Sequence, residues 1–417
     1  MKMATLSENE IFLTFIAVAL LLTGAYICGK IMEFLKAPKV VGEIIGGMLF
    51  GGTFLAHFLP DAMVAIFQGY AEEGKVLNVF YQMGLVFLMF SSGFNTRIEF
   101  DKKKTRTIAC LFTGATVLPM IAALPFAGFF QSSFIGEGNN QVSYVLVFII
   151  GVAITSIPVI SKIFFDMGIM NTEFANTVLT VSTFQDLCLW ILLNIATRIV
   201  TTGEIKLLDM ILVVALTIGM FVIAKLVTDY LHGYKRDTKA TDFYTICFIA
   251  LFLVAAVMAK FGINIMYSAF LVGYIVKAAS ESDSKAKGRM QAVADFSFSL
   301  FVPVYFALVG IQLNLLHNFS MIRFLLFFVL AFLLEAVGTA VMLLFTKLRK
   351  ESIINFAITM NARGGPGIVL ATVAYSYEII SVEFFTVLIL TTMLSSLIAG
   401  YWLRSQQKKD ETIFTNI

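Results

Sequence analysis

Residues 171–199 read NTEFANTVLTVSTFQDLCLWILLNIATRI, a mostly apolar stretch with Gln185 and Asp186 near its centre. Its length is sufficient for a helix to cross the roughly 30 Å hydrocarbon core of a bilayer. A bare carboxylate at that depth has no water to solvate it, and an acid in such a place is usually functional. The stretch therefore predicts a membrane-spanning helix with Asp186 as a functional residue.

The composition extends this interpretation to the whole chain. Of its 417 residues, 59% are hydrophobic and 14% are charged, and the mean hydropathy is +0.88. Because charged residues make up about a quarter of an ordinary soluble domain, we predict an all-α polytopic membrane protein surrounded by lipid. The net charge of +3 is spread over loops rather than concentrated on one face, which argues against a nucleic-acid partner.

The residues that commonly bind metals are scattered. The four cysteines lie singly in four apolar stretches, without CxxC or Cys/His spacing, which argues against a structural metal or a disulfide framework. The sequence contains no phosphate loop, nucleophile elbow or metalloprotease helix. We therefore expect neither an enzyme nor a bound cofactor.

Thirteen apolar stretches are long enough to cross a membrane. They lie near residues 10–32, 38–58, 76–96, 106–130, 142–165, 171–199, 207–229, 241–260, 262–278, 290–313, 321–346, 352–376 and 380–403. We expect a single transmembrane domain over residues 1–403, followed by a short cytoplasmic tail over residues 404–417.

The distribution of basic residues predicts the orientation in the membrane. Most of the 30 lysines and arginines fall in the C-terminal tail and in the loops that follow every second stretch, beginning with the first. Basic loops remain in the cytoplasm. We therefore expect a protein of the cell (inner) membrane with its N-terminus outside and its C-terminus in the cytoplasm.

Three sequence features recur in the same order in both halves of the chain. Residues 41–47 (VGEIIGG) are echoed by 268–274 (SAFLVGY), residues 90–94 (FSSGF) by 307–311 (ALVGI), and Pro158 by Pro366. Each pair lies seven stretches apart, and an odd offset inverts the second copy. We predict two inverted six-helix repeats, about 10–199 and 241–403, joined by a linker helix at 207–229.

Two apolar stretches are interrupted near mid-depth by helix-unfriendly runs. These runs are Thr155-Ser156-Ile157-Pro158 and Arg363-Gly364-Gly365-Pro366-Gly367. Freed carbonyls and hydroxyls at such breaks can offer oxygen ligands to a hard cation, and the partial charges of opposed helix ends could be balanced by Asp186 and Arg363. Simple packing kinks are the alternative, although a symmetric pair of kinks is less expected.

Burial disfavours the bare carboxylate of Asp186, so a proton and a metal cation would compete for it. Competition of this kind gives exchange if the site opens to one side at a time. The alternative is a structural acid paired with a neighbouring helix.

Glu335 lies near the centre of the stretch 321–346. It could join Asp186 in the ion site, or it could neutralise Arg363, and the sequence leaves both possibilities open. Glu43, Asp166 and Asp295 lie nearer the ends of their stretches, where we expect them to cap helices or line a funnel.

As an ordered set, several motifs resemble those of the bacterial monovalent cation:proton antiporter superfamily, especially its Kef-type and Nap-type branch. The motifs are APxVVGEIxGG at 37–47, GLxFLxFxSG at 84–93, AITSxP at 153–158 with Gln185-Asp186, SAFLVG at 268–273, VPVYFxxxG at 302–310 and RGG at 363–365. The resemblance covers nearly the whole chain.

The resemblance implies a thirteen-helix, sodium/proton-antiporter-like fold in which a homodimeric scaffold supports a mobile core that moves like an elevator. It also implies that Asp186 binds the cation or proton, and that Gln185 before it is typical of the electroneutral Kef-type pattern. The chain departs from the family in one place. Many relatives have a Lys or Arg in the helix that corresponds to residues 321–346, whereas the ionisable residue near the centre of that stretch here is Glu335.

The favoured function is exchange of K⁺ or Na⁺ for H⁺, with Asp186, Gln185, Thr155, Ser156 and Glu335 at the ion site. Pro158, Arg363, Gly364, Gly365 and Pro366 would shape the broken helices. The alternatives are a non-coupled K⁺ efflux channel or sensor on the same fold, and a Na⁺-coupled organic-anion transporter. The short tail favours the antiporter over a channel gated by a fused domain.

Overall fold

The computed structural model describes residues 5–95, 105–170, 172–203, 240–261, 264–280, 284–317 and 319–410, with Phe414 and isolated positions between 211 and 226. The described residues form helices and contain no strand, only an isolated β-bridge between Ile135 and Ile380. Nine helices among them are long and apolar enough to cross a membrane. The all-α membrane fold class is therefore confirmed, whereas most of the expected linker helix at 207–229 lies outside the described residues.

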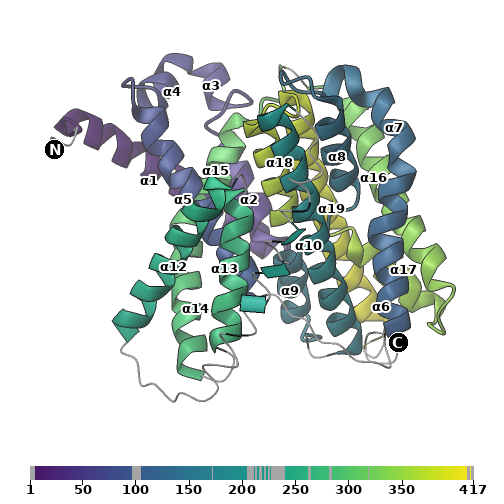
Figure 1. The fold of residues 1–417 in the computed structure, drawn as a ribbon. Coiled ribbons are helices and arrows are strands. Elements are labelled where there is room, and N and C mark those ends of the chain that lie inside the picture. The colour runs from purple at the N-terminus through teal and green to yellow at the C-terminus, as the bar shows by residue number, and fades with distance from the viewer. Residues whose placement is uncertain are drawn as a thin grey trace.

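The helices form two bundles, seen side by side in Figure 1. The first, called here the scaffold bundle, consists of α1 (Glu8–Phe34), α2 (Lys39–Met48), α3 (Leu55–Phe58), α4 (Pro60–Phe67), α5 (Glu73–Asn95), α12 (Ala240–Lys260), α13 (Ile265–Ser280), α14 (Ser284–Ser299) and α15 (Phe301–Gln312). The short helices α3 and α4 lie together at one end of it.

The second bundle is called here the core bundle. It consists of α6 (Thr105–Phe112), a π-helical turn (Thr113–Val117), α7 (Leu118–Phe134), α8 (Gln141–Val152), α9 (Ile157–Asp166), α10 (Glu173–Thr202), α16 (Met321–Leu343), α17 (Lys350–Met360), α18 (Gly365–Ser376) and α19 (Val382–Lys409). Extensive helix–helix packing between described residues stays within one bundle or the other.

Close packing in the scaffold bundle depends on glycines that allow two backbones to touch. A Cβ atom at Gly47 of α2 would overlap the carbonyl of Ala307 in α15, and a Cβ atom at Gly93 of α5 would overlap the carbonyl of Phe270 in α13. Gly310 and Gly273 make the return contacts from α15 and α13. The four segments that resemble one another in the sequence therefore form two crossings, one between α2 and α15 and one between α5 and α13.

Two expected helices are divided. The stretch 38–58 forms only α2 and the short α3, because α2 ends at Met48, Gly51 and Gly52 follow, and α3 begins at Leu55. The stretch 290–313 is split into α14 and α15 at Leu300, which departs from helical geometry. Pro303 accounts for this split, because it has no N–H to donate to the carbonyl four residues earlier.

The last helix continues beyond the expected end at residue 403 into the segment expected to be a tail. Its final turns run to Lys409 and lie against α9. Arg404 lies 3.6 Å from Asp166, and the Gln407 side chain donates to the carbonyl of Met167 at 2.8 Å. Side-chain contacts with the core bundle therefore stabilise helix in residues 404–409.

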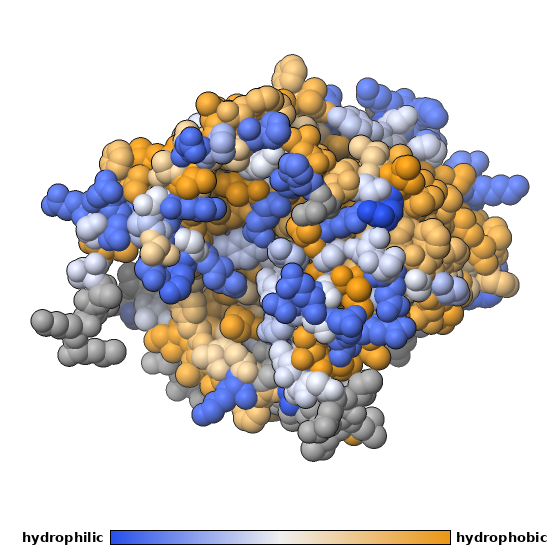
Figure 2. All heavy atoms as spheres, turned by 90° about the horizontal axis from the view of Figure 1, so that it is seen from above, coloured by the Kyte–Doolittle hydropathy of each residue, from blue (hydrophilic) through white to orange (hydrophobic). Residues whose placement is uncertain are grey.

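The lateral surface of the bundles is apolar. Ile322, Leu325, Val329, Leu333 and Val337 project from α16 and are each about half exposed or more. Viewed onto one end, the molecule shows hydrophilic residues over that end and many hydrophobic residues around its rim (Figure 2). This distribution suits a protein whose sides contact lipid and whose ends contact water.

Candidate functional site: two crossed, interrupted helices

The site lies where two interrupted helices of the core bundle meet. α8 ends at Val152 and α9 begins at Ile157, while α17 ends at Met360 and α18 begins at Gly365. The backbone N–H of Ser156 donates to the carbonyl of Ala362 at 2.7 Å, which joins one gap to the other. The helices are thus interrupted where the sequence predicts, and the two interruptions touch.

Proline and glycine shape both gaps. Pro158 lies in the first turn of α9 and Pro366 in the first turn of α18, where a missing N–H costs nothing. The Ser156 hydroxyl accepts a hydrogen bond from Val159 N–H at 3.4 Å and so caps α9. A Cβ atom at Gly364 would overlap the side chains of Val159 and Ser156, so the crossing requires glycine there.

Glu335 and Arg363 form a buried ion pair beside the gaps. The Glu335 carboxylate lies 2.7 Å from Arg363 Nη2, and the two side chains are 0% and 1% exposed. Thr155 donates to Glu335 at 3.2 Å, and Arg363 also donates to the carbonyl of Val152 at 2.8 Å and to the side chain of Asn361 at 3.2 Å. This geometry corresponds to the alternative in which Glu335 neutralises Arg363. The Arg363 guanidinium also lies at the C-terminal end of α8, where the helix dipole favours a cation.

Asp186 is buried in the middle of α10 without such compensation. Its side chain is 1% exposed, and neither carboxylate oxygen has a hydrogen-bond partner among the described residues. No ion pair between described residues joins it to Arg363, which pairs with Glu335 instead. A bare carboxylate without a partner is costly to bury, so this group requires either a proton or a cation.

Gln185, the residue before Asp186, is held by backbone groups from two other helices. Its amide nitrogen donates to the carbonyl of Ala115 at 3.2 Å and to that of Ala153 at the end of α8. Its carbonyl oxygen Oε1 is buried and has no hydrogen-bond partner in the part of the chain that the structure describes. One uncommitted amide oxygen and two uncommitted carboxylate oxygens therefore lie on consecutive residues.

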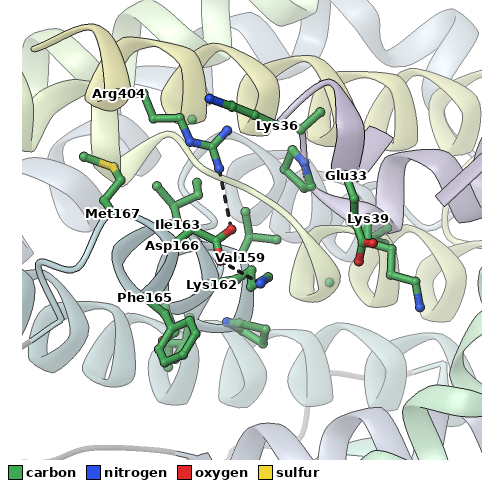
Figure 3. Close-up of a pocket in the computed structure, with 18 of the residues that line it drawn as sticks. Glu33, Lys36, Lys39, Val159, Lys162, Ile163, Phe165, Asp166, Met167 and Arg404 are labelled. Atoms are coloured by element: carbon green, nitrogen blue, oxygen red, sulfur yellow. Dashed lines mark hydrogen bonds and ion pairs between the residues drawn. The ribbon is translucent and has the colours of Figure 1, made fainter. Parts of the chain in front are cut away.

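A cavity of about 1450 Å³ separates the two bundles and reaches the helix gaps. Pro158 and Gly365 line it on the core side, and Val40 and Leu88 line it on the scaffold side; Asp186 is not among its lining residues. Its ionic side chains near α9 and the end of α1 are shown in Figure 3. The cavity therefore extends from these ionic side chains to the two helix gaps.

Two of the three acids expected to line a funnel do line this cavity. Asp166 lies 2.7 Å from Lys162 and 3.6 Å from Arg404 (Figure 3), and Glu43 lies 3.1 Å from Lys39. Asp295 is not among the lining residues and accepts a hydrogen bond from Gln291 on its own helix. Sequence reasoning missed Arg404, which it placed in a tail, and Asn361, whose proximity to Arg363 in the gap was the available signal.

Comparison with known proteins gives the same assignment over almost the whole chain. Residues 17–406 match the profile of the family described as sodium/hydrogen exchanger, transmembrane. A solved structure of the sodium proton antiporter MjNhaP1 from Methanocaldococcus jannaschii superposes with a TM-score of 0.68 at 17% identity, covering 96% of this chain and 97% of that one. At this identity the structural match speaks for the fold alone.

Relatives of similar length and longer relatives both match. The Na⁺/H⁺ antiporter NhaS4 of Synechocystis is 22% identical over 404 residues, covering 95% of this chain and 97% of the relative. Cation/H⁺ antiporter 15 of Arabidopsis thaliana is 21% identical over 373 residues, covering 87% of this chain. The chain spans about half or less of the plant and yeast relatives that it matches, 44% in that case and 33% for the K⁺/H⁺ antiporter 1 of Saccharomyces cerevisiae. The resemblance read from the motifs is thus confirmed: the chain belongs to the transmembrane sodium/hydrogen exchanger family.

Proposed function

We propose that the protein is a secondary active antiporter that exchanges a monovalent cation, Na⁺ or K⁺, for H⁺. The observation that carries the proposal is the Asp186 carboxylate, which is buried without a hydrogen-bond partner among the described residues, next to Gln185, whose amide donates to Ala153 in the first helix gap. A proton and a cation each satisfy this group, and each excludes the other. Cation uptake then releases the proton, which couples the two fluxes.

The ligands around Asp186 suit a singly charged ion. Ser182 lies one helical turn before Asp186, and its hydroxyl, like the Gln185 amide oxygen, is buried without a partner in the described structure. Together they offer neutral oxygens and one uncompensated negative charge, which matches one positive charge. The names of matching relatives, which include a Na⁺/H⁺-K⁺ antiporter from Bacillus cereus, support the same class of cargo.

The remaining predicted site residues take two roles in this proposal. Thr155 and Ser156 shape the crossing, and Glu335 neutralises Arg363 so that Asp186 keeps its charge available. Direct participation of Glu335 in ion binding remains the competing prediction.

Alternating access follows from the arrangement of the two bundles. The core bundle contains the crossing, the scaffold bundle faces it across the cavity, and the extensive packing lies within each bundle. We propose that the core moves as a body against the scaffold, as in an elevator. With the N-terminus outside, the cavity opens toward the cytoplasm, which corresponds to an inward-facing state.

Two further features belong to this proposal. The reciprocal crossings of α2 with α15 and of α5 with α13 support two inverted repeats. Apolar side chains of α1 and α12, among them Phe15, Ile27, Ile249 and Leu253, are exposed on the scaffold bundle, and we propose a homodimer in the inner or plasma membrane.

Purified protein in liposomes containing a trapped pH-sensitive dye tests the proposal. Addition of Na⁺ or K⁺ is expected to drive H⁺ movement, Li⁺ is tested alongside, and Ca²⁺ serves as the divalent comparison. Asp186→Asn should abolish cation-dependent H⁺ flux while leaving the protein folded, because an amide cannot exchange a proton for a cation at neutral pH. Exchange by Asp186→Asn at the wild-type rate would refute the site, and K⁺ movement without H⁺ movement would indicate a channel.

A further inference from the structure

The nitrogen of the Gln185 side-chain amide faces groups that can only accept hydrogen bonds. The carbonyls of Ala115 and Ala153 both accept hydrogen bonds from Nε2, which has two hydrogens to donate. An amide oxygen in that place would face acceptors and gain no bond. These neighbours therefore fix the amide orientation and leave Oε1 as the free end.

The carbonyl of Ala115 is available for this contact because of its own helix. In an α-helix it would accept the N–H of residue 119, but residue 119 is proline, which has no N–H and whose ring pushes against that carbonyl. The chain between α6 and α7 adopts a π-helical turn here, with the N–H of Leu118 donating to the carbonyl of Thr113. Such turns often occur at functional sites.

We propose that Pro119 and the π-helical turn Thr113–Val117 are a positioning device that makes Gln185 present its carbonyl oxygen to the cation held by Asp186. The inference rests on the proposed antiport function and deepens it by assigning residues that set cation affinity. Gln185 then contributes a neutral ligand without adding a second negative charge.

Substitution of Pro119 tests the positioning role directly. Pro119→Ala restores an N–H that competes with Gln185 for the Ala115 carbonyl. Loss of one such hydrogen bond is expected to raise the half-saturating cation concentration about three- to tenfold. Cation-induced thermal stabilisation in detergent should shift to higher cation concentrations by the same factor, which provides a readout independent of transport.

Pro125→Ala is the matched control. Pro125 also lies inside α7, but it is exposed, and the carbonyl four residues before it belongs to Ile121, whose side chain is 58% exposed. The same chemical change in the same helix should leave the half-saturating cation concentration unchanged. If Pro119→Ala is not recovered in folded form, deletion of Val117, which removes the extra residue of the π-turn, is expected to give the same shift.

A double-mutant cycle separates positioning from general packing. Gln185→Met removes Oε1 at similar volume and should raise the half-saturating cation concentration; adding Pro119→Ala to it should have no further effect. Additive effects, or wild-type cation dependence of Pro119→Ala, would overturn the inference. Failure of the underlying function looks different, because Asp186→Asn would then still exchange, or the wild-type protein would move no protons.

Discussion

At the scale of single residues, two acids of the core bundle that are no more than 1% exposed, Glu335 and Asp186, have opposite surroundings. Glu335 lies against Arg363 and Thr155, so its charge is balanced within the protein. Asp186 has uncommitted oxygens in the described structure, so its charge must be balanced by something that enters. A transport site needs an unpaired acid such as Asp186, because a carboxylate that is permanently paired within the protein is not available to bind and release a cation.

This contrast makes a prediction about Glu335. Glu335→Gln should leave the Arg363 charge buried without its counter-charge and destabilise the protein by about 3–5 kcal/mol. The melting temperature in detergent should fall, while the remaining folded protein keeps cation-induced stabilisation. If Glu335 instead binds ions, flux and cation-induced stabilisation should fall while the melting temperature of the ion-free protein stays constant.

Glu383→Gln is the control for this measurement. Glu383 pairs with Arg323 at 2.6 Å between the first turns of α19 and α16, where the side chains of Arg323 and Glu383 are 43% and 10% exposed. Because the Arg323 side chain reaches solvent, water can solvate its charge when the partner is removed, and a pair exposed in this way contributes about 0–1 kcal/mol. A melting temperature that falls as far in Glu383→Gln as in Glu335→Gln would contradict the special role of the buried pair.

At the scale of helices, the gaps depend on the absence of side chains at one position. Gly364→Ala should force α9 and α18 apart, because the new methyl group would overlap Val159 and Ser156. We expect a lower melting temperature and loss of exchange. Gly128→Ala is the matched control, since a Cβ atom there meets nothing within 4 Å and alanine favours the helix. Wild-type exchange by Gly364→Ala would contradict this prediction, because it would show that exchange does not require close contact between α9 and α18.

Helix boundaries also show what could be predicted from the sequence. Both gaps follow from proline and glycine within a few residues, and burial of Asp186 follows from the apolar residues around it. The split at Leu300 has a local cause as well, Pro303, which the hydropathy pattern of residues 290–313 conceals. By contrast, Arg363 pairs with Glu335 and Ser156 bonds to Ala362 across long sequence separations. No local pattern specifies those contacts, because they depend on how whole helices pack.

At the scale of the whole molecule, the loop charges predict a topology. Residues 97–106 and 230–240 are rich in lysine and arginine, so both loops should lie in the cytoplasm. Lys103, in the first of these loops, lies outside the described residues. A cysteine introduced at this position in a background without Cys28, Cys110, Cys188 and Cys247 should react with a membrane-impermeant maleimide only after the cells are opened. Reaction in intact cells would reverse the topology and place the cavity on the outer side.

The proposed movement of the core bundle against the scaffold bundle can be tested by cross-linking the two. The Tyr401 hydroxyl of the core bundle donates to the carbonyl of Leu35, just after α1 of the scaffold, at 2.9 Å, and both residues line the cavity. Leu35→Cys with Tyr401→Cys, made in the same cysteine-free background and joined by a short bismaleimide, should hold the bundles together. Because transport requires them to move, exchange should stop in the cross-linked fraction only.

A cross-link within one bundle is the control for that experiment. Arg323→Cys with Glu383→Cys joins α16 to α19 inside the core bundle, where the wild-type side chains are in direct contact. The same reagent should leave exchange near the rate of the uncross-linked double variant, because the core moves as one body. Full exchange after complete cross-linking of positions 35 and 401 would contradict movement of the core against the scaffold. Inhibition by both cross-links would instead place the essential motion within the core, among the helices that surround Asp186.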